Sequence, residues 1–269
     1  MTGHDDVVQA LMPHSGIHVQ ELADETAGQR HQRYQSQREG VRMLGLVPPA
    51  YRSLILDSTP RTPAQRWLIA RTRQLPAPST ALIPHAEATL LTLLAASCRA
   101  CRIVEVGRFT GYTTLALAMG ACPGGRLVSW EEAPNDEWVL IAREASEMAG
   151  ISDRIDFRNG RPANTGCRGL RSSLPERGLT AEVEQQLDLA VIDAERVNHR
   201  SYWDLLVPRM RSGGIVVVRL THSPHVGKGQ EIARNVLLHM RSDSRMQPVD
   251  LPYAKGLAIA RRSDYVETL

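Results

Sequence analysis

Five short apolar segments alternate with stretches of helical spacing, and this alternation constrains the fold more than any other feature. Each segment is bounded by turn residues, which is typical of a buried strand. The segments are Arg102–Val106, Arg126–Trp130, Ile155–Arg158, Leu187–Ile192 and Ile215–Val218. Strands that alternate with helices predict a doubly wound α/β fold with a mostly parallel sheet and a ligand crevice at the carboxyl ends of the strands.

The predicted helices include Asp136–Ala149, which gathers apolar residues on one face, Tyr202–Met210 and Gln230–Met240. Two further short strands, Val249–Leu251 and Gly256–Ala260, predict a terminal hairpin that completes a seven-stranded sheet.

The first 75 residues differ in character from the rest of the chain. They are rich in glutamine, arginine and proline, including the pair Pro48 and Pro49. We therefore assign residues 1–75 to a helical lid or dimerisation arm, and residues 76–269 to the α/β domain.

Composition narrows the class of protein. A chain of 269 residues with 42% hydrophobic content can bury one sizeable core. It has no apolar run of the ~20 residues that span a bilayer. The net charge of +3 does not by itself indicate nucleic-acid binding. Four arginines between Arg161 and Arg177 are interpreted as a solvated surface connection, although such a cluster could also meet an anionic substrate.

The cysteines are few and scattered. Cys98 and Cys101 have the CxxC spacing of zinc or redox sites, but Cys122 and Cys167 stand alone, whereas structural zinc usually needs two such pairs. We therefore expect small buried side chains, reduced thiols and a cytoplasmic location.

The stretch from Val104 to Thr114 is the most informative motif. A strand runs into a turn with the pattern ExGxxxG and then into a helix. Such glycines let a ligand approach the backbone, and the new helix presents unpaired N–H groups. The third glycine of a dinucleotide-binding GxGxxG is missing, which disfavours a nicotinamide-dependent oxidoreductase. About twenty residues on, Glu131 and Glu132 follow the second strand, where nucleoside-binding proteins place a carboxylate that binds ribose hydroxyls. Glu131 fits this role best, because it comes directly after the strand.

With these residues in place, the chain resembles the caffeoyl-CoA and catechol O-methyltransferase family of class I S-adenosylmethionine-dependent enzymes. The resemblance runs from about His85 to Arg261. The similar segments are His85–Leu91 (family EGQFL), Glu105–Thr113 (EIGxFTGYS), Ile141–Glu144 and Ala149–Asp156 (IAR…AGV…KI), Ile192–Arg196 (IDADK) and Leu205–Gly214 (LLxxGG).

The resemblance implies a Rossmann-like methyltransferase fold with S-adenosylmethionine as the methyl donor. Its donor-binding residues would be Glu105, Gly107, Thr110, Gly111 and Thr113, which meet the methionine end, together with Glu131 at the ribose and Asp193 beside the reactive methyl. It also implies a homodimer, whose N-terminal arm sets substrate choice.

The departures from the family pattern concern its divalent cation. The family binds the cation through the aspartate of IDADK, here Asp193, and an Asp-Asn pair that here reads Arg219-Leu220. Arginine and leucine offer no oxygen ligands, so we expect no catalytic metal. We hypothesise that Arg219 reaches Asp193. It would then either supply the fixed charge that orients an anionic substrate oxygen, or fill the void with a salt bridge.

The family's lysine after the aspartate, a candidate base, is here Arg196, which stays protonated. A hydroxyl acceptor must lose a proton, and an unperturbed histidine titrates near ~6.5. His222, after the fifth strand, is our first candidate for the general base, and His199 is the second.

The predicted function is metal-independent methylation of a small molecule, in particular an oxygen of an aromatic or secondary-metabolite scaffold. Asp193, Arg219, His222 and His199 are the predicted catalytic residues. The alternative is a protein that binds S-adenosylmethionine without transferring methyl, as a partner subunit or in other chemistry. An RNA methyltransferase is disfavoured, so neither nucleic acid nor a membrane is an expected partner.

Overall fold

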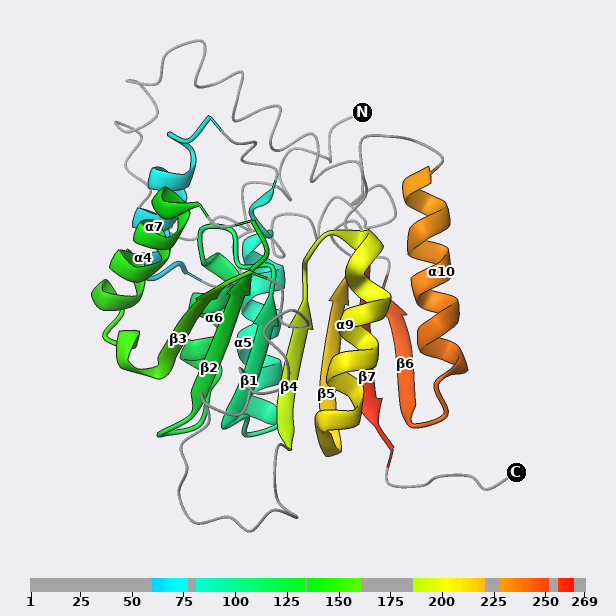
Figure 1. The fold of residues 1–269 in the computed structure, drawn as a ribbon. Coiled ribbons are helices and arrows are strands. Elements are labelled where there is room, and N and C mark those ends of the chain that lie inside the picture. The colour runs from blue at the N-terminus through cyan, green and yellow to red at the C-terminus, as the bar shows by residue number, and fades with distance from the viewer. Residues whose placement is uncertain are drawn as a thin grey trace, which may run out of the picture. The chain divides into compact units, whose positions relative to one another are not determined.

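A seven-stranded sheet in the order β3-β2-β1-β4-β5-β7-β6 forms the centre of the computed structural model (Figure 1). The structure describes residues 60–76, 81–133, 135–160, 186–220, 228–251 and 256–263. The first five strands pair in parallel, while β7 runs antiparallel to both β5 and β6. The predicted doubly wound, mostly parallel sheet with a terminal hairpin is therefore confirmed.

The strands lie close to their predicted positions. They are β1 (Arg102–Val106), β2 (Arg126–Glu131), β3 (Ile155–Asn159), β4 (Leu187–Ile192), β5 (Met210–Arg219), β6 (Met246–Leu251) and β7 (Leu257–Arg262). Because β1 has β2 on one side and β4 on the other, the chain reverses its direction of winding there. Such a switch point is where open α/β sheets bind their ligands.

Helices cover both faces of the sheet. They are α4 (Pro63–Thr72), α5 (His85–Ser97), α6 (Tyr112–Gly120), α7 (Asp136–Met148), α9 (His199–Leu206) and α10 (Lys228–Ser242). One apolar core joins the sheet to α4, α5, α6 and α7, and the other joins its opposite face to α9 and α10. Figure 1 shows α5 and α6 behind the strands and α9 in front of them. None of the helices in the described ranges is long and apolar enough to cross a membrane.

Three predicted boundaries were wrong, namely both ends of the helix before β5 and the start of β5 itself. The predicted helix Tyr202–Met210 begins earlier, at His199, and gives way after Leu206 to a 3-10 turn that contains Pro208. Proline lacks the N–H that a helix needs in its interior. The strand then begins at Met210 instead of Ile215, because Met210 pairs with Leu187 across a register shift in β4.

The helix α4 lies within the segment assigned to the N-terminal arm. Its Thr62 cap accepts a hydrogen bond from the Gln65 N–H, and the Gln65 side chain accepts one from the Thr62 N–H. Its buried Ala64 and Leu68 belong to the same core as α5, α6 and α7. This part of the arm therefore packs as an integral element of the α/β domain. Residues 1–59, and with them the predicted lid or dimer contact, lie outside the described residues.

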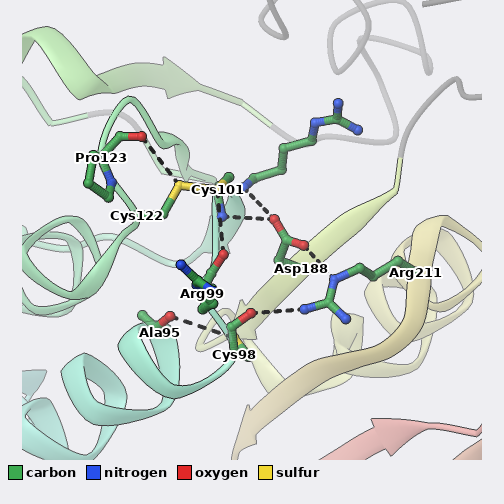
Figure 2. The surroundings of a disulfide bond; sticks show 9 residues. Ala95, Cys98, Arg99, Cys101, Cys122, Pro123, Asp188 and Arg211 are labelled. Atoms are coloured by element: carbon green, nitrogen blue, oxygen red, sulfur yellow. Dashed lines mark hydrogen bonds and ion pairs between the residues drawn. A yellow bond between two sulfur atoms is a disulfide. The ribbon is translucent and has the colours of Figure 1, made fainter.

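A disulfide joins Cys101, the residue before β1, to Cys122, just after α6 (Figure 2). The expectation of reduced thiols was wrong for this pair. A strand and the helix that follows it run in opposite directions. The start of β1 and the end of α6 therefore lie close together, at the amino ends of the parallel strands. Cys98, the CxxC neighbour, is a free thiol. Cys167 lies outside the described residues.

Polar contacts beside the disulfide also hold this region of the chain in place. In Figure 2 the Asp188 carboxylate of β4 accepts a hydrogen bond from the Cys101 N–H (2.8 Å) and pairs with Arg211 of β5 (2.6 Å). Arg211 also donates to the Cys98 carbonyl at 2.9 Å. Noncovalent contacts thus join the segment before β1 to β4 and β5, in addition to the disulfide.

Removal of the disulfide should lower the free energy of unfolding. The bond closes a loop between cysteines 21 residues apart, and loops of this size restrict the unfolded chain by about 3 kcal/mol. The measurement is urea unfolding of the wild type with and without reductant, beside a Cys101→Ser/Cys122→Ser variant. The reduced wild type and the variant should unfold at the same lower urea concentration. A variant as stable as the oxidised wild type would contradict this.

Candidate functional site

Two glycines and a phenylalanine with a positive φ angle shape the turn between β1 and α6. Gly107 and Gly111 have φ values of +98° and +89°, and Phe109 has a φ of +52°. A Cβ on Gly107 would lie 2.3 Å from the Asp193 carbonyl oxygen at the end of β4. Only glycine therefore allows the donor loop, residues 107–111, to pass this close to β4.

Glu131, at the carboxyl end of β2, faces this loop. Its Oε2 accepts a hydrogen bond from the Phe109 N–H at 2.7 Å, and its Oε1 accepts one from the Ala133 N–H at 3.3 Å. These bonds orient the carboxylate beside the turn. The structure thus brings Glu131 and the donor loop together, as the sequence predicted.

Glu132 has a different environment from its neighbour. Its carboxylate accepts hydrogen bonds from the Asn198 side chain (3.1 Å), the Tyr202 hydroxyl and the Glu195 N–H (3.2 Å). It therefore anchors the segment between β4 and α9. Ribose binding by Glu131 in preference to Glu132 stays a prediction.

Glu105 is fully buried beneath the donor loop. Its Oε2 accepts hydrogen bonds from the hydroxyls of Thr114 and Ser129, both at 2.6 Å, while its Oε1 has no hydrogen-bond partner in the described part of the chain. Burial raises the pKa of this carboxyl from 4.5 to about 7, against the opposing effect of the two hydroxyls and of the Arg108 charge. An unpartnered carboxylate oxygen at this point fits the ammonium group of a donor's methionine moiety.

Replacement of Glu105 should change how stability depends on pH. Between about pH 4.5 and pH 7 the folded protein keeps a proton that the unfolded chain has released, so the free energy of unfolding falls as pH rises. The shift corresponds to about 3 kcal/mol. Glu105→Gln should lose this decline, whereas Glu137→Gln on the exposed start of α7 should keep it. Urea unfolding at pH 5, 6, 7 and 8 measures this, and parallel profiles for the wild type and Glu105→Gln would contradict it.

The remaining residues predicted to bind the methionine end of the donor lie in the interior. Thr110 and Thr113 are buried, and Thr110 accepts a hydrogen bond from the Thr72 hydroxyl at 2.8 Å. Thr72 belongs to α4, so this helix of the predicted arm touches the donor loop directly. The Tyr112 hydroxyl lies 2.9 Å from Nδ1 of His85, which ties the starts of α5 and α6 together.

Three charged side chains meet where the carboxyl ends of β4 and β5 lie beside the first turn of α5. Arg219 pairs through Nη1 with Asp193, and through Nε with Glu87 at 2.5 Å. The contact predicted between Arg219 and Asp193 is therefore present. Glu87 and the arginine side chain are 1% and 5% exposed, and Glu87 Oε2 has no hydrogen-bond partner among the described residues.

Electrostatics in this cluster follow from burial. Desolvation raises the pKa of Glu87 and of Asp193, and Arg219 opposes both shifts. Burial alone would lower the pKa of Arg219, but the charges of Asp193 and Glu87 raise it. One cation is thus shared by two carboxylates, so Arg219 carries no uncompensated positive charge.

Sequence reasoning did not identify Glu87. Its signal is weak, since it is the single acidic residue of helix α5 and lies in the first turn, where the helix dipole commonly favours acidic side chains. Only the folded chain shows that this turn lies against the end of β5.

Removal of Arg219 should be strongly destabilising. In Arg219→Met the two carboxylates would stay buried without a cation, a change that typically costs about 3–5 kcal/mol. The loss should shrink at low pH, where both carboxyls can bind protons. The control is Arg241→Met, because the Arg241 side chain in its pair with Asp250 is 60% exposed and surface pairs contribute about 0–1 kcal/mol. Equal losses of unfolding free energy in the two variants would overturn the role of burial.

The structure describes only one of the two histidines predicted as the general base. His199 is buried, and its Nε2 lies 2.9 Å from the Ala194 carbonyl oxygen, so it contacts the segment that follows Asp193. His222 lies outside the described residues. The general base therefore stays a prediction.

A divalent cation does not fit this cluster. The position that would need an oxygen ligand carries a guanidinium, and that group is already bonded to the two nearest carboxylates. Within the described ranges no group of three or more histidine, cysteine, aspartate or glutamate residues could hold a metal. The donor loop, in contrast, offers what a nucleoside-containing sulfonium needs: a glycine turn, a helix start and two acidic residues at adjacent strand ends.

The parallel sheet, its switch point and this loop define a class I methyltransferase. Residues 58–263 match the model of the O-methyltransferase family, and the chain belongs to that family. It is accordingly an S-adenosylmethionine-dependent O-methyltransferase, as the resemblance implied.

Similarity to individual proteins agrees with this assignment. Tricin synthase 1 of Oryza sativa subsp. japonica is 31% identical over 189 residues, which cover 65% of this chain and 72% of that protein. Among solved structures, the O-methyltransferase TomG from Streptomyces achromogenes, in complex with SAM, has a TM-score of 0.61 at 21% identity and covers 84% of this chain and 96% of its own. The O-methyltransferase from Bacillus cereus in complex with SAH has a TM-score of 0.65 at 19% identity and covers 80% and 97%. These two structures support the fold.

Proposed function

We propose that this protein methylates an oxygen of a small aromatic or secondary-metabolite acceptor without a divalent metal. The observation that carries the proposal is the buried contact of Arg219 with Asp193 and Glu87. It joins the ends of β4 and β5 directly, where the resemblance implies a bridging cation. The named activity of tricin synthase 1 supports an aromatic acceptor.

Each side chain of the site then has a distinct role. When bound, S-adenosylmethionine supplies an electrophilic methyl group on a sulfonium. Glu131 binds the ribose hydroxyls, and Glu105 and the donor loop hold the methionine end. Asp193, fixed by Arg219, borders the methyl group and limits the direction from which an acceptor can approach. Alignment of this kind can account for much of the acceleration of a displacement reaction.

The proton of a hydroxyl acceptor needs a separate base. Arg219 cannot accept it, because a guanidinium stays protonated at any working pH. We assign this role to His222, from its place after β5 in the sequence. His199, whose Nε2 contacts a backbone carbonyl, is the second candidate.

Donor binding should be independent of metal and should depend on Glu131. Calorimetric titration of the EDTA-treated protein with S-adenosylhomocysteine should give the same dissociation constant with and without magnesium. Glu131→Ala should weaken binding by about 10- to 100-fold, the size expected when hydrogen bonds to a charged group are lost. Glu137→Ala, on the exposed start of α7, is the matched control and should bind like the wild type.

The outcomes separate the alternatives. Binding that requires magnesium would contradict the metal-free site, and no binding at all would contradict the donor pocket. Donor binding without methyl transfer to any of a broad panel of phenols would favour a binding protein over an enzyme that acts on phenols. Retention of tRNA at moderate salt would favour an RNA acceptor.

We further infer a homodimer, from the predicted arm, and a small-molecule substrate. A cytoplasmic location stays a prediction, and the argument from reduced thiols no longer supports it, because Cys101 and Cys122 form a disulfide.

A further inference from the structure

We propose that Arg108 is a positioning residue that holds the donor-binding edge of the sheet in register, so that Glu131 faces the donor. The proposal rests on the proposed donor site. Arg108 is the second residue of the donor loop, yet its side chain turns away from solvent and is only 2% exposed. A buried arginine in a ligand-binding loop needs a structural or functional explanation, because arginine is rarely buried without partners.

The guanidinium spans the ends of two neighbouring strands. Its Nη1 donates to the carbonyl oxygens of Ser129 in β2 (2.9 Å) and of Arg158 in β3 (3.1 Å). Its Nη2 donates to Oδ1 of Asn159 at 3.0 Å. Asn159 is the direct partner of Glu131 in the pairing of β3 with β2. One side chain therefore links the donor loop to the strand that carries Glu131 and to the neighbouring strand β3.

Main-chain contacts carry this link to the carboxylate. The N–H groups of Gly107 and Arg108 both donate to the Trp130 carbonyl oxygen, at 2.9 and 3.2 Å. The next residue, Phe109, donates its N–H to Glu131 at 2.7 Å. Arg108 thus attaches the loop to β2 twice, once through its side chain and once through its main-chain N–H.

Charge and stacking explain why the residue is arginine. The guanidinium carbon lies 5.3 Å from the centre of the Phe157 ring, and the guanidinium of Arg143 lies 5.0 Å from the same ring. Burial lowers the pKa of Arg108, and the charges of Glu105 and Glu131 oppose this shift. A planar fork can bond to several carbonyl oxygens at once, whereas a lysine ammonium acts as a single point charge.

The test compares donor affinity with stability. Arg108→Met and Arg108→Lys should weaken binding of S-adenosylhomocysteine by about tenfold or more, as expected from the loss of more than one hydrogen bond. With an acceptor in hand, KM for S-adenosylmethionine should rise while kcat at saturating donor stays near the wild-type value. Arg143→Met is the matched control: it loses the same kind of ring contact and should leave donor affinity unchanged.

A double-mutant cycle separates positioning from general destabilisation. If Arg108 acts through Glu131, Arg108→Lys should weaken donor binding much less in a Glu131→Gln background than in the wild type. Asn159→Ala, at an exposed position that should tolerate change, should also weaken binding several-fold, and it should add little to Arg108→Lys.

Several results would overturn the proposal. Unchanged donor affinity in folded Arg108→Lys or in Asn159→Ala would do so, as would additive effects of Arg108→Lys and Glu131→Gln. If Arg108→Met fails to fold, the lysine and asparagine variants decide the question. Failure of the wild type itself to bind S-adenosylhomocysteine would instead refute the proposed function.

Discussion

The close approach of Gly107 to the end of β4 is the constraint on which the site depends. The Asp193 N–H donates to the Val106 carbonyl at 2.8 Å, and a side chain on Gly107 would collide with the Asp193 carbonyl. The donor loop and the predicted methyl-transfer position can therefore be adjacent only while this residue is glycine. Glu105 lies in β1 directly before the loop, and Arg219 pairs with Asp193, so this contact connects the two parts of the site.

Two buried arginines hold the carboxyl ends of the parallel strands, and they share one electrostatic pattern. Arg219 lies between Asp193 and Glu87, and Arg108 lies within the field of Glu105 and Glu131. A buried cation needs compensation, and so does each buried carboxylate. The two groups of charges meet both requirements, and they add side-chain links to the backbone bonds between the strand ends.

The sequence was sufficient for the sheet, the donor loop and the contact between Arg219 and Asp193. Apolar periodicity and glycine spacing are local signals, and they placed β1 and β4 at their observed bounds. The disulfide was missed because Cys122 has no cysteine near it in the sequence and gives no pairing signal. Glu87 and Arg108 were missed for a different reason, since their partners are distant in the chain. Glu87 and Arg219 are 132 residues apart, and Arg108 and Asn159 are 51 apart. Neither residue type reveals such a partner until the strands are aligned.

The charge balance around Arg219 also bears on how an acceptor would be held. A divalent cation brings two positive charges and open coordination positions, whereas Arg219 brings one charge and directs its Nε and one Nη toward carboxylates. The guanidinium therefore fixes Asp193 more than it attracts an anionic oxygen. Of the two roles weighed for this residue, filling the vacated metal position agrees better with the geometry. In the proposed metal-free reaction, orientation and deprotonation of the acceptor therefore fall to other side chains.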